Sequence, residues 1–327
     1  MEEVIISVDA LGGDNAPQVV LDGVVMALEQ DPALKVLLVG PADVVEPFAS
    51  AHERVEAVVA TQSIDMGEHP ATAVRTKRDS SIVVGCKLVK DGRAQGFFSA
   101  GSTGACLTAA TLVMGRIKGI KRPALATVLP APGHPVVLTD VGANADCKPE
   151  YLLQFGQMGA VYARIMLGYE QPRIALLNIG SEDTKGSQFA QETFSLMKEQ
   201  LTGFVGNAEG NDLLRGGHDV FVTDGFTGNV VLKSLEGAFK MIMDSLKGIM
   251  MAKTSTKLAG ALLKPQLREF KHSVDPDAYG GAPLLGVKGV CIIGHGSSKP
   301  KAIASGIAAT AKAVRMDMVS LIESQVS

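Results

Sequence analysis

The sequence has few cysteines, almost no net charge and no long apolar run, and each shortage excludes a class of protein. Its cysteines, Cys86, Cys106, Cys147 and Cys291, are scattered, with no C-x-x-C pair and no metal-like grouping with the six histidines. We therefore expect reduced thiols in a cytosolic protein without a metal site. The 31 basic and 34 acidic residues give a formal net charge of -3, which argues against a nucleic-acid partner.

Membrane-spanning and nucleotide-binding patterns are also missing. No apolar run reaches the roughly 18 residues that a transmembrane helix needs. The start, MEEVIISVDA, is acidic and passes directly into an expected strand, unlike a signal peptide. Neither the G-x-G-x-x-G dinucleotide pattern nor a P-loop is present. The 327 residues are enough to bury a large core, and we expect a single α/β domain over 1–327.

Short β-branched runs alternate with segments of helical periodicity along the chain. This alternation predicts a three-layer α/β/α sandwich, in which helices cover both faces of a mostly parallel sheet. Residues 124–140 differ, because two apolar runs joined by a Pro- and Gly-containing turn predict an antiparallel hairpin in a mixed sheet. Strands are expected at 4–10, 35–40, 55–60, 96–100, 135–142, 173–180, 203–210, 218–225 and 288–296, and helices at 148–167, 187–200, 226–251 and 298–323.

Glycine, small hydroxyl residues, Asn and Asp follow most of the expected strands. Because the carboxyl ends of parallel strands share one edge of a sheet, we expect these ends to meet in one crevice. Glycine lets the backbone approach a ligand, and the helix that follows points free N–H groups at it, which suits phosphate. One such turn alone is commonly only a β–α connection, so the prediction rests on all of them. They read VDALGGDNAP (8–17), SAGSTGA (99–105), TDVGANADCKPE (139–150), LNIGSEDTKGS (177–187), NAEGND (207–212), TDGFTGN (223–229) and IGHGSSKP (293–300).

Six motifs stand in an order that resembles the bacterial phosphate acyltransferases of phospholipid synthesis. They are VDALGGDNAP, SAGSTGA, DVGANADCKP, NIGSEDTKG, DGFTGN and YGGAPLLGVKG, and the likeness extends over the whole chain. The resemblance implies transfer of a fatty acyl group from acyl carrier protein to inorganic phosphate, giving acyl phosphate. It also implies a fold related to the phosphotransacetylases and to the isocitrate/isopropylmalate dehydrogenase type. A homodimer in the cytoplasm, in peripheral contact with the membrane and a membrane acyltransferase, is implied as well.

This reaction needs little acid–base help from the protein. A thioester is already activated, and its thiol leaving group has a pKa near 8.5, so no Ser-His-Asp triad is required and none is evident. The site has to hold a phosphate dianion, orient it at the carbonyl and stabilise the oxyanion that develops. We assign catalytic roles to Lys185, as the cation for phosphate, and to Asn229 and Asn144, as neutral amide donors. We expect no cofactor.

The other residues predicted to bind substrate come from the same strand ends. Asp9, Asp140 and Asp224 end strands, but a carboxylate repels phosphate, so we expect them to cap loops, orient Lys185 or bind a cation. Plainer interpretations stay open: Lys185 as a solvated lysine, Asn229 as a helix cap, and His295 as a packed loop residue. The predicted substrate-binding set is Gly13, Asp14, Ser99, Gly101, Ser102, Thr103, Gly104, Asp140, Gly142, Gly180, Gly186, Asp224, Gly228, His295, Gly296 and Ser297.

Residues 244–270 interleave apolar and basic side chains and predict a helical amphipathic excursion from the domain. We expect membrane contact through Leu258, Leu262 and Leu263. The alternative is a helix packed on its own protein or on a dimer partner. Basic residues in this segment, in RTKR (75–78) and in GRIKGIKRP (115–123) are three candidate docking sites for the acidic carrier protein.

Two other functions remain open. A phosphotransacetylase- or phosphotransbutyrylase-like enzyme would perform the same chemistry with coenzyme A as the thioester carrier. A noncatalytic anion- or nucleotide-binding protein with a dehydrogenase-like fold belongs to a different class, and the missing G-x-G-x-x-G pattern counts against it.

Overall fold

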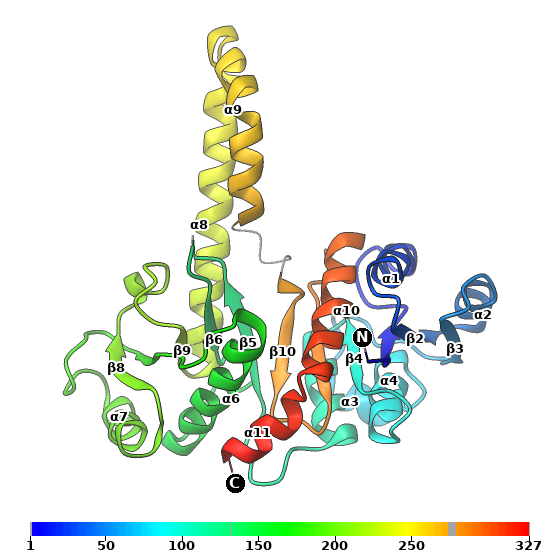
Figure 1. Ribbon diagram of the computed structural model, residues 1–327, viewed down its shortest axis with the longest axis horizontal. Coiled ribbons are helices and arrows are strands. Elements are labelled where there is room, and N and C mark those ends of the chain that lie inside the picture. Colours follow the sequence, from blue (N-terminus) through cyan, green and yellow to red (C-terminus); the bar gives the residue numbers. More distant parts are fainter. Residues whose placement is uncertain (1, 132, 274–278, 327) are drawn as a thin grey trace.

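One sheet of eleven strands runs through the computed structural model, which describes residues 2–131, 133–273 and 279–326 (Figure 1). Its strand order is β3-β2-β1-β4-β11-β10-β5-β6-β9-β7-β8. The strands are β1 (Val4–Asp9), β2 (Leu34–Gly40), β3 (Val55–Val59), β4 (Gly96–Ser99), β5 (Ala124–Leu129), β6 (Val136–Thr139), β7 (Ile174–Leu177), β8 (Phe204–Ala208), β9 (Val220–Val222), β10 (Ala282–Leu285) and β11 (Val290–Ile293).

Three antiparallel pairings at the centre divide this sheet into two parallel sets. Strand β10 is antiparallel to both β11 and β5, and β5 and β6 form the predicted antiparallel hairpin. The other pairings are parallel. Because three reversals are an odd number, β6, β9, β7 and β8 run opposite to β3, β2, β1, β4 and β11. Their carboxyl ends therefore leave opposite edges of the sheet, and the expectation that all the polar strand ends share one edge is wrong.

Helices cover both faces of the sheet, which confirms the three-layer α/β/α sandwich. Adjacent residues of a strand serve opposite layers, so Phe97 belongs to one buried cluster and Phe98 to the other. One helical layer holds α1 (Gln18–Gln30), α2 (Ala42–Ser50), α6 (Pro149–Leu167), α7 (Gln188–Gln200), α10 (Pro300–Arg315) and α11 (Met318–Val326). The layer on the other face of the sheet holds α3 (Pro70–Thr76), α4 (Ser81–Lys90), α5 (Thr103–Ala109), the π-helical turn η1 (Ala110–Met114) and the first turns of α8 (Gly225–Met251).

The ends of the long helices follow local sequence signals. Helix α6 begins with Pro149 at its first position and ends at Gly168, whose φ of 78° is the left-handed conformation that glycine favours. The single helix expected over 298–323 is instead two helices, α10 and α11. The chain breaks between them where Asp317 takes a positive φ of 49°, a backbone conformation that cannot continue a right-handed helix.

Helices α8 and α9 (Thr254–Ser273) form an antiparallel hairpin that projects from the sheet (Figure 1). Only the first part of α8 packs on the core, through Val231, Leu232 and Leu235. At 27 residues α8 is about 40 Å long, so its second half extends beyond the sheet with α9 beside it. The segment 244–270, predicted as a helical excursion, contains the end of α8 and most of α9.

Candidate active site

The predicted site residues fall into two groups, because the strands that carry them end at opposite edges. The first group follows β1, β4 and β11, and the second follows β6, β7 and β9. The first group contains Gly13, Asp14, Ser99, Gly101, Ser102, Thr103, Gly104, His295, Gly296 and Ser297, and the second contains Asp140, Gly142, Asn144, Gly180, Lys185, Gly186, Asp224, Gly228 and Asn229.

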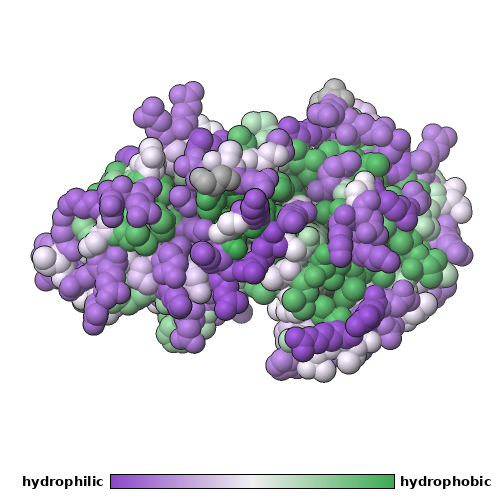
Figure 2. Space-filling view, turned by 90° about the horizontal axis from the view of Figure 1, so that it is seen from below, coloured by the Kyte–Doolittle hydropathy of each residue, from purple (hydrophilic) through white to green (hydrophobic). Residues whose placement is uncertain are grey.

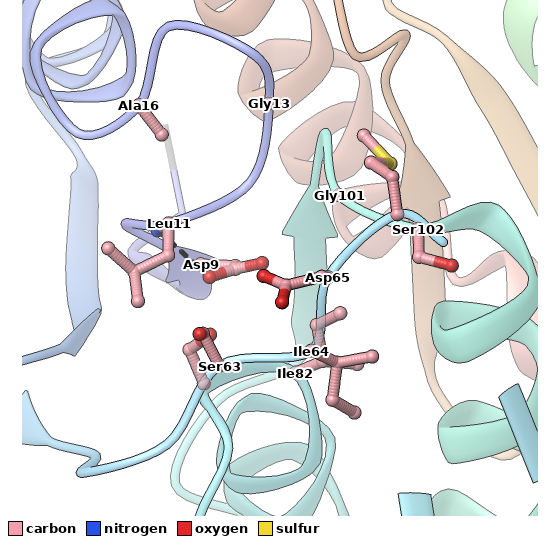
Figure 3. Close-up of a pocket in the computed structure, with 12 residues that line it drawn as sticks. Asp9, Leu11, Gly13, Ala16, Ser63, Ile64, Asp65, Ile82, Gly101 and Ser102 are labelled. Carbon is pink, nitrogen blue, oxygen red and sulfur yellow. Dashed lines mark hydrogen bonds between the residues drawn. The ribbon is translucent and has the colours of Figure 1, made fainter. Parts of the chain in front are cut away.

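The first group borders a cavity of about 240 Å³ that two aspartates face (Figure 3). The side chains of Asp9 and Asp65 point toward one another in this cavity. Burial raises the pKa of Asp9, while hydrogen bonds from Ser99 Oγ, at 2.7 Å, and from the N–H of Leu11, at 3.0 Å, oppose the rise. Two carboxylates in one cavity do not favour a bare phosphate dianion there.

The hydroxyl groups of the glycine-rich turn after β4 largely serve the turn itself. Ser99 Oγ accepts the N–H of Gly101 at 3.0 Å and donates to Asp9, and Ser102 caps α5 by accepting the N–H of Ala105. In the neighbouring loop His295 Nδ1 lies 2.8 Å from Ser297 Oγ. The first group is therefore held together by its own polar contacts, and its role in substrate binding stays a prediction.

Asp140 organises the second group. Its Oδ1 accepts the N–H groups of Leu125, Gly142 and Ala143 at 3.0 to 3.2 Å. Its Oδ2 accepts the N–H and the side-chain Nδ2–H of Asn144 at 2.7 and 2.8 Å. Burial raises the pKa of this carboxyl group, and the donated hydrogen bonds oppose the rise. Asp140 thus caps the loop after β6, one of the roles expected for the strand-ending aspartates.

Asn144 joins three segments through this loop. Its Nδ2 donates to Asp140 and to the carbonyl oxygen of Pro123, at 2.8 Å each. Its own carbonyl oxygen accepts the N–H of Gly225, the first residue of α8, at 2.7 Å. Both amide hydrogens are therefore used inside the protein, an arrangement that favours a positioning role over the predicted role as a donor to substrate.

Asp224, and not Asn229, is the cap of α8. Its Oδ1 accepts the N–H of Thr227 at 2.8 Å, and its Oδ2 accepts the Thr227 hydroxyl at the same distance. Asn229 lies one turn inside the helix, so the interpretation of Asn229 as a helix cap is wrong. A Cβ at Gly228 would lie only 1.9 Å from the carbonyl oxygen of Asp140, so α8 can approach the loop after β6 only with glycine there.

The Asn229 side chain lies beside this loop with its amide free. A Cβ at Gly142 would be 3.8 Å from Asn229 Oδ1, which places the amide against the backbone of the loop after β6. Asn229 is exposed, and no side-chain hydrogen bond holds its amide within the described residues. Unlike Asn144, Asn229 can therefore donate to a ligand without losing a bond of its own.

Lys185 lies in the loop that leads into α7. Its Nζ is 3.7 Å from Glu182 Oε1 and its side chain is 48% exposed, so this ion pair stabilises the fold little. The loop itself is held by Asn178 Nδ2, which donates to the carbonyl oxygen of Lys185 at 3.1 Å. Gly186 follows with a φ of 93°, and Ser187 Oγ caps α7. The ammonium group of Lys185 is therefore available to an anion near the start of α7.

A cavity of about 400 Å³ connects the loop after β6 with the starts of α7 and α8. Its apolar wall includes Phe189 of α7 and Phe226 of α8, and the side chain of Phe226 is 66% exposed. Burial raises the pKa of Cys147 to about 12, so this thiol is not an activated nucleophile. Sequence reasoning missed both phenylalanines, although Phe226 stands inside the motif DGFTGN, directly after the glycine that starts α8. The cavity is lined by Ala145, Asp146, Cys147, Phe189, Asp224, Phe226 and Thr227.

The described residues contain neither a metal cluster nor a membrane-spanning helix. Among the described residues, no group of three or more His, Cys, Asp or Glu side chains is gathered as a metal site requires. In the same part of the chain, no helix has both the length and the apolar character needed to cross a bilayer.

Solved structures show the class of fold. A phosphotransacetylase from Streptococcus pyogenes matches with a TM-score of 0.63 at 15% identity, over 96% of this chain and 94% of that one. A branched-chain phosphotransacylase from Enterococcus faecalis V583 matches with a TM-score of 0.61 at 16% identity, over 95% of this chain and 99% of that one. The chain thus has the phosphotransacetylase type of α/β/α fold, as expected.

Sequence relatives narrow this class to one family. A family model described as "Fatty acid synthesis protein" matches residues 4–321. A phosphate acyltransferase of Lysinibacillus sphaericus is 45% identical over 318 residues, 97% of this chain and 96% of the relative. A phosphate acyltransferase of Heliobacterium modesticaldum is 47% identical over 330 residues, 98% and 97% of the two chains. The chain belongs to this family of acyltransferases, and the resemblance drawn from the six motifs is confirmed.

The Asp140 network generates a first prediction. In Asp140→Asn, an amide NH₂ replaces one acceptor oxygen and faces N–H groups that have lost their partner. We expect a loss of about 1–3 kcal/mol in the free energy of unfolding, measured in urea, and a fall in kcat. Asp146→Asn, an exposed change in the same loop, is the control and should leave the unfolding curve in place. Equal stability of the two variants would contradict the central role of Asp140.

Proposed function

We propose that this protein transfers a fatty acyl group from the thioester of acyl carrier protein to inorganic phosphate, for phospholipid synthesis. A phosphate oxygen attacks the carbonyl carbon, the C–S bond breaks, and the carrier leaves as a thiolate, which takes up the proton that the hydrogen phosphate gives up. Family membership supports acyl transfer to phosphate. The observation that carries the proposal is the second group, where Lys185 lies just before α7 and Asn229 lies in the first turns of α8, the two helices whose starts line a partly apolar cavity.

Phosphate fits the second group better than the first. Lys185 supplies a positive charge, and the starts of α7 and α8 direct backbone N–H groups toward the same region. Asn229 adds a neutral donor for phosphate or for the oxyanion of the tetrahedral intermediate. Two aspartates line each cavity, Asp9 and Asp65 in the first group and Asp146 and Asp224 in the second, so the positive charge of Lys185 is what favours the second group. We therefore place phosphate beside Lys185.

The thioester then belongs in the cavity between α7 and α8. Phe189 and Phe226 give this cavity an apolar wall that can hold the acyl or thioester end of the substrate. Burial raises the pKa of Cys147, so the thiol stays protonated, which fits direct attack by phosphate without an acyl-enzyme intermediate. The protein's part is positioning and charge stabilisation, since the thioester needs no further activation.

Coenzyme A is the alternative carrier, because the solved structures with this fold are named phosphotransacetylase and phosphotransacylase. The test measures phosphate-dependent thiol release from palmitoyl-acyl carrier protein and from palmitoyl-coenzyme A, with acyl phosphate trapped by hydroxylamine. We expect the carrier-protein thioester to have the higher kcat/KM. A preference for coenzyme A would favour the alternative. The absence of turnover with either thioester would favour a noncatalytic anion-binding protein.

A second prediction concerns the two proposed catalytic residues. Lys185→Ala and Asn229→Ala should each lower kcat roughly a hundredfold, because each removes a contact to charge that develops in the transition state. Both side chains are exposed, so the free energy of unfolding should change by less than about 0.5 kcal/mol. Lys198→Ala, which removes a surface lysine paired with Asp183 at 2.8 Å, is the control. Near-normal turnover at saturating phosphate would exclude the residue concerned.

We further propose a cytoplasmic homodimer that meets the membrane, and a membrane acyltransferase, through the α8–α9 hairpin. Leu258 and Leu262 are 69% and 73% exposed, and Leu263 is also exposed. Exposed lysines accompany them on the same hairpin, which suits an anionic bilayer surface. The acyl phosphate product carries an apolar chain that must reach a membrane enzyme, which gives such contact a purpose.

A third prediction tests this membrane contact. Leu258→Glu with Leu262→Glu should release the protein from anionic vesicles, because burying two leucines stabilises binding by about 3 kcal/mol or more. Raised salt should weaken binding of the unmodified protein. Turnover in solution should survive, since both leucines are in α9, whereas the site residues Phe226 and Asn229 lie at the far end of α8, in its first turns. Vesicle sedimentation and size measurement are made on both proteins.

The matched control replaces two exposed leucines elsewhere, Leu214→Glu with Leu321→Glu, and should remain vesicle-bound. The competing explanation is that the hairpin leucines lie in the dimer interface or support the fold. It forecasts a monomeric or unfolded double variant, together with no vesicle binding by the unmodified protein. A folded, dimeric and still vesicle-bound double variant would also contradict the membrane proposal.

A further inference from the structure

Five exposed cationic side chains lie on two neighbouring segments of the chain, and we call them the basic patch. The loop after η1 contributes Arg116, Lys118, Lys121 and Arg122, and the turn between β10 and β11 contributes Lys288. The two segments are paired, because Lys288 donates its N–H to the carbonyl oxygen of Gly115 at 2.8 Å. Within the described residues, no carboxylate lies within ion-pair distance of any of the five.

The loop that carries four of these cations is firmly anchored. Ile117 and Ile120 are buried in the core, so the charged residues around them are held at the surface. Gln154 of α6 binds the loop twice, accepting the N–H of Lys121 at 2.8 Å and donating to the carbonyl oxygen of Gly119 at 3.0 Å. The backbone is therefore fixed, and the uncompensated charge lies at a defined place.

The basic patch adjoins the proposed active site. Arg122 precedes Pro123, whose carbonyl oxygen accepts Asn144 Nδ2–H, and two residues later Leu125 donates its N–H to Asp140. The loop of the basic patch and the loop after β6 thus share hydrogen bonds. Within the described residues, the other two basic stretches share no hydrogen bond with the loop after β6. Residues 75–78 form the end of α3 and the residues just after it, and there Lys77 is paired with Glu68 at 2.6 Å.

The projecting end of the α8–α9 hairpin lies even further from the proposed active site. Figure 1 shows the hairpin projecting at the top of the molecule, whereas the loop before β5 lies at the bottom, beside the carboxyl-terminal helix α11. One contact supports this position of the loop: a Cβ at Gly119 would lie 3.7 Å from the carbonyl oxygen of Val326, the last residue of α11. Figure 2, which views the molecule from below, shows polar and apolar surface side by side and a notch at one edge. A flat bilayer that meets the hairpin tip therefore cannot also meet the basic patch.

We propose that the basic patch is the docking surface for the acidic carrier protein that delivers the acyl thioester, an inference that rests on the proposed function. Unpaired surface cations attract an acidic partner and orient it during encounter. Docking here places the carrier next to the loop of Asp140 and Asn144, so that its flexible thioester arm can enter the cavity between α7 and α8. The hairpin at the opposite end stays free for the membrane.

The test reverses three charges of the patch in Lys118→Glu with Lys121→Glu and Arg122→Glu. We expect KM for octanoyl-acyl carrier protein to rise about tenfold or more, with kcat at saturation within about twofold, because the site itself is unchanged. Turnover of octanoyl-N-acetylcysteamine, a small uncharged thioester without a carrier protein, should be unaltered. The salt dependence of KM for the carrier protein should weaken in the variant.

The matched control reverses the same number of charges on the hairpin, in Lys253→Glu with Lys257→Glu and Lys264→Glu, and should leave KM for the carrier protein unchanged in solution. Binding of fluorescently labelled acyl carrier protein is measured in parallel by anisotropy. Docking is thereby tested whether or not turnover occurs, while failure of every thioester to turn over would count against the proposed function alone. An unchanged KM and affinity in the patch variant would overturn the proposal. So would an equal loss in the hairpin control, or a patch variant that loses only vesicle binding.

Discussion

The carboxylate of Asp140 holds together the part of the molecule on which the proposed chemistry depends. It binds the start of β5 through Leu125, the loop after β6 through Gly142 and Ala143, and Asn144 twice. Asn144 extends this network to Pro123 and to the first residue of α8. One buried carboxylate therefore sets the position of the helix that carries Asn229, and of the loop that carries the basic patch.

The reversal of strand direction explains why the polar strand ends do not act as one crevice at one sheet edge. The hairpin β5–β6 was recognisable from residues 124–140, and its single reversal already sends the later strands to the other edge, because the two reversals made with β10 cancel. Strand β10 has four residues between glycine-rich turns, too short a pattern to separate from a loop. Edge assignment depends on whether the number of reversals is odd or even, so β10 leaves it unchanged, and the expectation of one shared edge is wrong because it did not apply the hairpin's reversal to the strands that follow.

Local features of the sequence predicted local structure well. The strand expected at 96–100 is β4, and the helix expected at 187–200 is α7. Asp224 was also detectable as the cap of α8, since Thr227 stands three residues later in a position that a capping carboxylate reaches. The partners of Asn144 and the cavity beside Phe226 were not detectable from the sequence, because both depend on how loops distant in sequence meet.

Charge distribution, and not net charge, decides what this surface can bind. A formal charge of -3 over 327 residues excludes a strong general preference for polyanions, yet five cations that have no carboxylate partner among the described residues lie beside one loop of the proposed site. At physiological ionic strength, electrostatic influence fades over about 8 Å, so a docking protein senses this neighbourhood and little of the rest. An acidic carrier can therefore be attracted to one end of a near-neutral protein. The projecting hairpin offers apolar side chains at the other end, so delivery of the thioester and release of an apolar product need not compete for one surface.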